Sequence, residues 1–216
     1  IFVDNREIQA EEGQNLLQAC LQNGIYIPNL CHIDGMVDPP ASCRMCFVEM
    51  EGEGHPIPSC TVAVRDGMVV KTDTESVRRL QRTGLQLLLS VHHVDCGHCP
   101  ANKNCELQRI AKFLKAGLKP KHLDNRLQET EVEEGHPFLT YYPNRCVLCG
   151  KCVVVCKATH GKALLTFAKR GLDTVVTSYG EKEISDLPCK QCHACVDICP
   201  VSAIILKSEN SPQDRS

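Results

Sequence analysis

The sequence of 216 residues contains no tryptophan, few aromatic residues and almost no net charge. With a formal charge of −2, the chain has no excess of positive charge that would attract the phosphates of a nucleic acid or an anionic membrane surface. No apolar run approaches the roughly 20 residues that a membrane span needs, and the best is the short stretch 85–91. The chain does not open with the charged and apolar segments of a secretory signal. We therefore expect a cytoplasmic protein with no membrane span and no nucleic-acid partner.

Motifs that hold phosphates or nucleotides are also missing. Neither G-x-G-x-x-G nor G-x-x-x-x-G-K occurs, so we predict no dinucleotide site and no phosphate loop in this chain. The length allows one to three small domains but not one large enzyme core. We predict no catalytic residue here, and any hydride chemistry is expected in a partner.

Cysteine, by contrast, is abundant, because the chain has 16. Nothing indicates export to an oxidising compartment, so metal ligands are a better interpretation than a disulfide scaffold. The cysteines form four groups, with Cys20 left over. Cys20 lies on the apolar side of a predicted helix over 14–23, where a free thiol is expected to act as a small hydrophobe.

The motif C-x2-C-x2-C-x3-C occurs twice near the C-terminus, and the second copy is followed by Pro200. In two-cluster ferredoxins three cysteines of such a run bind one [4Fe-4S] cluster and the fourth binds the other cluster. One predicted ligand set is therefore Cys146, Cys149, Cys152 and Cys199. The other is Cys189, Cys192, Cys195 and Cys156. Zinc would more naturally use two separated C-x2-C pairs.

The first group has the spacing C-x11-C-x2-C-x13-C and consists of Cys31, Cys43, Cys46 and Cys60. It resembles the plant-type [2Fe-2S] pattern, although its first gap is longer. We predict a [2Fe-2S] cluster, with a zinc site as the alternative. Arg44, between two of these ligands, is either a donor to sulfur or a solvated loop charge.

The second group, H-x3-C-x2-C-x5-C, supplies only three thiols, from Cys96, Cys99 and Cys105. A fourth ligand is needed, and we choose His92, with His93 as the alternative. The side chain of His98 is expected to point outward. Histidine ligation would raise the reduction potential of a [4Fe-4S] cluster, as it does in Rieske centres. From the spacing alone a zinc site with three thiolates and one imidazole also stays open.

The remaining patterns predict mixed helices and strands. A hairpin is predicted at the N-terminus, further strands over 43–50 and 57–64, and a helix that starts at a capping box of Thr72 and Glu75. A second amphipathic helix is predicted over 107–114. The predicted divisions are 1–73, 74–118, a partly solvated connection 119–138, 139–207, and a disordered polar tail 208–216.

The order of the four spacings resembles the N-terminal iron–sulfur region of the large peripheral-arm subunit of NADH:quinone oxidoreductase (complex I). The same region opens many [FeFe]-hydrogenases and NAD-linked formate dehydrogenases, and the chain is also similar to the gamma chain of soluble NAD-reducing hydrogenases. The resemblance covers 1–207, and its most specific part is "HHVDCGHCPANKNC"; "YPNRCVLCGKCVVVC" and "PSCTVAV" also look like the family. Ala41 and His93 stand where family members often have Gly and Pro, which affects loop details but no ligand.

The resemblance implies an α+β fold in three parts. These are a β-grasp [2Fe-2S] ferredoxin-like domain at 1–73, a small helical [4Fe-4S] domain with one histidine and three cysteine ligands at 74–118, and a bacterial-type two-[4Fe-4S] ferredoxin domain at 139–207. It makes His92 the fourth ligand of the second group. The implied cofactors are one [2Fe-2S] cluster and three [4Fe-4S] clusters.

The resemblance also implies an electron-transfer subunit. Its partners would be flavin and NAD(P)H-binding diaphorase subunits and a catalytic subunit such as a hydrogenase or formate dehydrogenase, or soluble ferredoxin. A truncated N-terminal part of an [FeFe]-hydrogenase and a zinc-bound scaffold without a redox role are the alternatives. The polar tail that ends at Ser216 favours a complete subunit.

Overall fold

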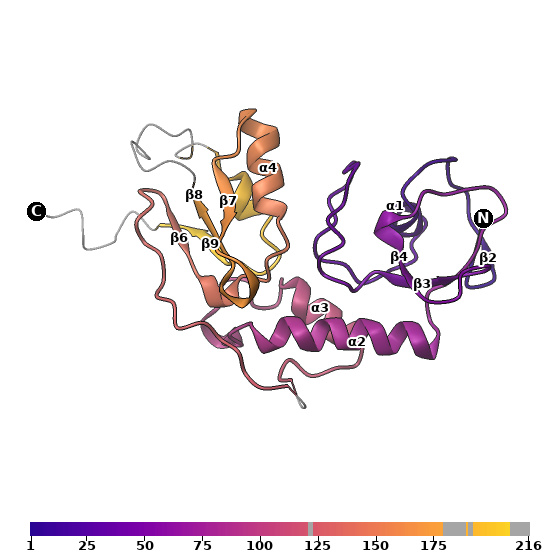
Figure 1. Cartoon of the computed structure of the whole chain (residues 1–216), viewed down its shortest axis with the longest axis horizontal. Coiled ribbons are helices and arrows are strands. Elements are labelled where there is room, and N and C mark those ends of the chain that lie inside the picture. Colours follow the sequence, from indigo (N-terminus) through magenta and orange to yellow (C-terminus); the bar gives the residue numbers. More distant parts are fainter. Residues whose placement is uncertain (121–122, 179–188, 190–191, 208–216) are drawn as a thin grey trace, which may run out of the picture. The chain divides into compact units, whose positions relative to one another are not determined.

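A computed structural model describes residues 1–120, 123–178, 189 and 192–207 (Figure 1). The predicted disordered tail, 208–216, lies outside the described residues. The chain forms two compact units, the first made of 1–90 and 106–124, the second of 91–105 and 125–216. The flanking helices of the predicted 74–118 domain thus belong to the first unit and its cysteine loop to the second. The domain boundaries given above stay a prediction.

The first unit contains a five-stranded mixed sheet in the order β2-β1-β5-β3-β4. Its strands are β1 (Phe2–Val3), β2 (Arg6–Glu7), β3 (Phe47–Met50), β4 (Ile57–Pro58) and β5 (Val69–Lys71). β1 and β5 are parallel, whereas the other pairs are antiparallel. The predicted N-terminal hairpin is confirmed, because Asp4 and Asn5 turn with positive φ between β1 and β2.

One helix, α1 (Leu16–Gln22), packs its apolar side into the core of this sheet. Its N-cap Asn15 accepts a hydrogen bond from the backbone N–H of Gln18 at 3.2 Å. The same side chain donates to the carbonyl of Cys60 at 2.5 Å, which joins the helix start to the last cysteine of the first group. A mixed sheet with one helix across it is the predicted β-grasp arrangement. Cys20 is fully buried in this core, as expected.

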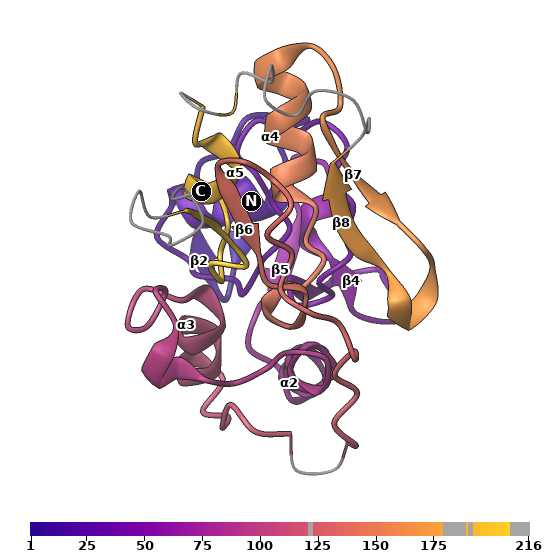
Figure 2. The same ribbon diagram turned by 90° about the vertical axis from the view of Figure 1, so that its left-hand side faces the viewer.

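Two further helices of the first unit are α2 (Glu75–Ser90), seen end-on in Figure 2, and α3 (Glu106–Phe113). The capping-box prediction at Thr72 is wrong, because Thr74 caps α2 by accepting from the N–H of Val77 at 3.2 Å. Thr72 instead donates its hydroxyl and its N–H to the carboxylate of Asp4. The second predicted helix is confirmed as α3, whose Leu107 and Ile110 are buried.

In the second unit each of the two cysteine motifs includes part or all of a helix, and a strand follows each motif. The helices are α4 (Lys151–His160) and α5 (Ala194–Asp197). β6 (Leu139–Tyr141) pairs antiparallel with β9 (Ile204–Leu206), and β7 (Leu165–Ala168) with β8 (Val175–Ser178). Short 3₁₀ turns across both units are η1 (Ser59–Thr61), η2 (Cys96–His98), η3 (Pro143–Arg145) and η4 (Gly171–Asp173). The internal repeat of the sequence is thus a repeat of local structure.

The connection predicted over 119–138 is bonded to the rest of the second unit at several points from residue 128 onward. The backbones of Glu133 and Tyr141 exchange hydrogen bonds at 2.9 and 3.0 Å. Gln128 is held by the side chain of Asn144. Within the described residues no helix is both long and apolar enough to cross a membrane.

Candidate functional site

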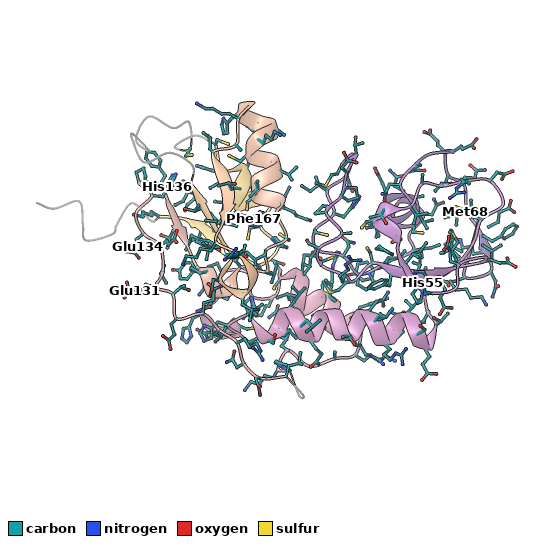
Figure 3. All side chains as sticks on the ribbon, in the orientation of Figure 1. His55, Met68, Glu131, Glu134, His136 and Phe167 are labelled. Carbon is teal, nitrogen blue, oxygen red and sulfur yellow. The ribbon has the colours of Figure 1, made fainter. Side chains whose placement is uncertain are left out.

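All sixteen cysteines lie in the described part of the chain, and all of them are free thiols. Fifteen of these thiols form the four groups that are the candidate sites. The first group lies in the first compact unit, and the other three lie in the second. The sulfur atoms are drawn in yellow in Figure 3. The first two groups lie in loops and 3₁₀ turns, whereas the C-terminal groups also include Cys152 and Cys156 of α4 and Cys195 of α5.

The first group is fully buried and consists of two pairs. The sulfurs of Cys31 and Cys43 lie 3.5 Å apart. Their hydrogen bond lowers the pKa of Cys31 and raises that of Cys43. In the same way, the hydrogen bond between Cys46 and Cys60 lowers the pKa of Cys60 and raises that of Cys46. Charges also couple the two pairs, so all four thiols share one buried space.

The backbone around Cys46 is fixed from two sides. The N–H and the hydroxyl of Ser59 both donate to the carbonyl of Cys46, at 2.9 and 2.8 Å. Gln81 of α2 donates to the carbonyl of Phe47 at 3.1 Å. Gly84 of α2 lies against the carbonyl oxygen of Arg44, so close that a Cβ there would be 2.8 Å from it. The helix therefore packs directly on the loop between the two middle cysteines.

The strand predicted over 43–50 begins only at Phe47, because the preceding residues form the loop and Arg44 has a φ of +52°. The side chain of Arg44 is exposed, which agrees with a solvated loop charge.

The second group lies in the loop between α2 and α3. Cys96, Cys99 and Cys105 are partly buried, and Cys96 starts the turn η2. His98 points outward as expected, with its side chain 86% exposed and its ring bonded to Asp95 at 3.0 Å.

His92 differs from the other histidines of this loop. Its ring is half-buried, whereas His93 is exposed. Nδ1 of His92 lies 2.9 Å from the carbonyl oxygen of Arg145. Burial lowers the pKa of His92, which favours the neutral ring that a metal requires.

The C-terminal repeat brings its cysteines together in two crossed sets. In one set, Cys146, Cys149 and Cys152 of the first motif lie near Cys199 of the second: burial, and to a smaller extent the charge of Cys199, raises the pKa of each of the three. In the other set, Cys189 and Cys195 lie near Cys192 and near Cys156 of the first motif: burial, and then the charges of these neighbouring thiols, raises the pKa of Cys189 and of Cys195. Burial and the neighbouring sulfurs raise the pKa of Cys149 and of Cys195 to about 12. These are the two sets expected from the ferredoxin pattern, and their role as ligands stays a prediction.

Backbone geometry wraps the repeat around these sulfurs. The N–H of Leu148 donates to the sulfur of Cys146 at 3.4 Å, and the N–H of Ala203 donates to that of Cys199 at 3.2 Å. Gly150, with a φ of +77°, starts α4 under the ring of Phe167, which is labelled in Figure 3. Such N–H···S contacts are among those that tune iron–sulfur clusters.

The second of these sets surrounds a small, mostly apolar cavity. It is bordered by Cys156, Cys189, Cys192 and Cys195. Leu164, Leu165 and His136, the last labelled in Figure 3, also line it. Four sulfur donors around an apolar space suit an iron–sulfur cluster, in which each thiolate binds a different iron. No three His, Cys, Asp or Glu side chains of the described residues are placed to hold one single ion.

Several residues that shape these sites carry no motif in the sequence. Gly84 and Gln81 are ordinary helix positions, and the carbonyl of Arg145 belongs to the backbone. Only Asn144, a turn-forming residue just before a cysteine motif, gave a signal that could have been noticed.

Three family models match separate parts of the chain. Residues 1–75 match the family model of 2Fe-2S iron-sulfur cluster binding domains. Residues 81–117 match the NADH-ubiquinone oxidoreductase-G iron-sulfur binding region. Residues 136–205 match the ferredoxin-like domain of NADH-quinone oxidoreductase subunit 3. The chain therefore contains a 2Fe-2S domain and further iron–sulfur binding regions, and the predicted α+β fold class is confirmed.

Nearly the whole chain aligns with one part of each of several longer proteins. It is 34% identical to a G subunit of an NADH-quinone oxidoreductase of Rhizobium meliloti (strain 1021), over 95% of this chain and 24% of the relative. It is 32% identical to an NADP-reducing hydrogenase subunit of Solidesulfovibrio fructosivorans, over 95% of this chain and 35% of the relative. The chain thus spans about a quarter to a third of these curated relatives.

A solved structure covers nearly the whole chain. It is a crystal structure of an NAD+-reducing [NiFe]-hydrogenase in the H2-reduced state, 30% identical, with a TM-score of 0.83. The match covers 97% of this chain and 88% of the hydrogenase chain. The chain therefore belongs to the family of iron–sulfur proteins that includes G subunits of NADH-quinone oxidoreductases and the matched chain of this NAD+-reducing hydrogenase.

Proposed function

We propose that this chain is an electron-transfer module that holds one [2Fe-2S] cluster and three [4Fe-4S] clusters. The single observation that carries the proposal is the crossing of the two C-terminal cysteine sets, because each set takes three cysteines from one motif and the fourth from the other. Crossed sets are typical of two-cluster ferredoxins. Clusters bound at the four sites would supply carriers of one electron each.

The ligands in this proposal are the groups described above. For the [2Fe-2S] cluster they are Cys31, Cys43, Cys46 and Cys60. For the three [4Fe-4S] clusters they are His92, Cys96, Cys99 and Cys105; Cys146, Cys149, Cys152 and Cys199; and Cys189, Cys192, Cys195 and Cys156. The two hydrogen-bonded pairs of the first group suit two irons that each take two protein thiolates.

His92 is the proposed histidine ligand because of its hydrogen bond. A carbonyl oxygen only accepts, so Nδ1 of His92 carries the proton that is shared with Arg145. In the neutral ring Nε2 then keeps its lone pair, which is what a metal needs. His93 and His98 are exposed, and His98 is bonded to Asp95.

The partners belong to the same proposal. One is a flavin and NAD(P)H-oxidising diaphorase module, and the other is a catalytic subunit such as a hydrogenase or formate dehydrogenase, or soluble ferredoxin. The names of the relatives, which include an NADH-quinone oxidoreductase subunit, an NADP-reducing hydrogenase subunit and an NAD+-reducing hydrogenase, support a link to NAD(P)H. A cytoplasmic location is also proposed, since so many free thiols need a reducing compartment.

Metal analysis of the anaerobically purified chain tests the cofactors. We expect about 14 iron atoms and a visible absorption spectrum with a brown colour. A colourless protein with stoichiometric zinc would instead indicate the zinc-bound scaffold and overturn the proposal.

The variant His92→Cys tests the histidine ligand. Replacing a neutral imidazole by a thiolate adds negative charge, so we expect an unchanged iron content and a lower reduction potential for that cluster alone. His93→Ala and His98→Ala are the matched controls, because both side chains are exposed neighbours. An unshifted potential and an unchanged EPR signal in His92→Cys would exclude His92 as a ligand.

A further inference from the structure

The turn before the first C-terminal motif is bonded directly to the loop of the second group. The N–H of His93 donates to the carbonyl of Asn144 at 2.6 Å. The ring of His92 donates from Nδ1 to the carbonyl of the next residue, Arg145, at 2.9 Å. Two consecutive carbonyls thus receive hydrogen bonds from two consecutive histidines. The position and tilt of the His92 ring therefore depend on where this turn lies.

The side chain of Asn144 holds the turn in place. Its Nδ2 donates to the carbonyl of Gln128 at 2.9 Å, and its Oδ1 accepts from the N–H of Gln128 at 3.0 Å. The side-chain amide of Asn144 thus bonds to both the N–H and the carbonyl of Gln128, as the backbone of a neighbouring strand would. Within the turn, the N–H groups of Arg145 and Cys146 donate to the carbonyls of Tyr142 and Pro143.

Three properties make Asn144 suited to this task. A side-chain amide presents a donor and an acceptor on one rigid plane, so it can pair with an extended backbone. Its main chain continues into the carbonyl that accepts from His92. Its side chain bonds to the backbone of Gln128, in the connection that precedes the turn. Asn144 thus acts on His92 through the backbone.

We propose that Asn144 is a positioning residue for His92: it fixes the carbonyl of Arg145, which in turn fixes the orientation of the imidazole and directs Nε2 toward the iron. This inference rests on the proposed function, in which His92 is a ligand. Hydrogen-bond partners that orient a metal-bound histidine typically change metal affinity by about 10- to 100-fold when they are lost. The effect of losing Asn144 should therefore be confined to the cluster that His92 binds.

The test uses the full chain with its clusters and three variants. Asn144→Ala removes both hydrogen bonds to Gln128, and Asn144→Asp keeps the acceptor while losing the donor. Gln128→Ala is the matched control, because Gln128 meets Asn144 through its backbone alone. The side chain of Gln128 reaches the carbonyls of Leu172 and Thr174 instead.

Two readouts are specific to the histidine. Pulsed EPR of protein labelled with ¹⁵N-histidine measures the hyperfine coupling of the ligating nitrogen, and a redox titration measures the potential of that cluster. For Asn144→Ala we expect a changed nitrogen coupling, a shifted potential and roughly tenfold faster iron loss to a chelator. Asn144→Asp should lie between Asn144→Ala and the wild type, and Gln128→Ala should match the wild type. The signals of the other clusters should stay unchanged in all three.

Three results would overturn the proposal. The first is a wild-type nitrogen coupling and potential in Asn144→Ala. The second is an equal change in Gln128→Ala, which would assign the effect to general loosening of the connection. If Asn144→Ala does not fold, a wild-type signature in Asn144→Asp is the third. Absence of any histidine nitrogen coupling in the wild-type protein would instead refute the ligand assignment itself, so the two failures are distinguishable.

Discussion

Gly84 offers a direct test of how α2 supports the [2Fe-2S] loop. A glycine in the middle of a helix ordinarily costs about 1 kcal/mol relative to alanine. Gly84→Ala would therefore be expected to stabilise the protein if this position faced open space. The structure predicts the opposite, because the helix approaches the backbone of Arg44 at this position.

The expected loss of stability follows from the contacts that the methyl group of an alanine would make at this position. An alanine Cβ at Gly84 would lie 2.8 Å from the carbonyl oxygen of Arg44 and 3.4 Å from Cγ of Met45. The oxygen belongs to the backbone between Cys43 and Cys46, so it cannot move without moving the two thiols. Overpacking of this kind costs about 1–3 kcal/mol. After the helix gain of about 1 kcal/mol is subtracted, the variant should be about 0–2 kcal/mol less stable.

Two measurements test the predicted effect of Gly84→Ala. Denaturation followed by far-UV circular dichroism measures the stability, and visible circular dichroism reports the environment of the [2Fe-2S] cluster. Thr83→Ala is the control, since Thr83 is exposed on the same helix and its loss should stabilise α2 by a few tenths of a kcal/mol. The reasoning is refuted if Gly84→Ala gains about 1 kcal/mol and its visible spectrum is that of the wild type.

Two further predictions concern the thiol outside the groups and the metal itself. Burial raises the pKa of Cys20 to about 12, so this thiol should resist alkylation at pH 8, and Cys20→Ala should cost about 1 kcal/mol while leaving the iron content unchanged. Peptide mapping after iodoacetamide treatment and iron analysis check this, and a loss of iron would make Cys20 a ligand. Removal of iron with a chelator should unfold much of the chain, because cluster binding supplies a large share of the folding free energy. Far-UV circular dichroism checks this second expectation, and a native spectrum in the iron-free protein would contradict it.

The sequence predicted the parts of this protein that depend on spacing. Cysteine spacing indicated the four groups, and the repeat indicated which cysteines would meet across the C-terminal unit. Helical periodicity located α2 and α3, since apolar side chains recur on one face of each. These predictions depend on residues close together in the sequence or on a known cluster pattern.

The errors arose where distant contacts compete with local preference. Thr72 and Glu75 have the spacing of a capping box, but Asp4 binds Thr72 and leaves Thr74 to cap α2. The strand predicted over 43–50 begins late, because the cysteines at its start belong to a loop. Asn144 could not be linked to His92 from the sequence, since that link exists only once the turn and the loop are folded together.

The short elements explain why clusters and fold depend on each other. Strands of two to four residues, such as β1 and β7, contribute few ladder hydrogen bonds and little buried surface. In each crossed set, however, three cysteines of one motif meet a cysteine from the distant copy, so a bound cluster joins segments that the strands alone would hold weakly. Asn144 also joins distant segments. Its side chain bonds to Gln128, and its backbone leads to the carbonyl that accepts from His92. We therefore expect variants at the proposed ligands and at Asn144 to alter a cluster signal before they abolish folding.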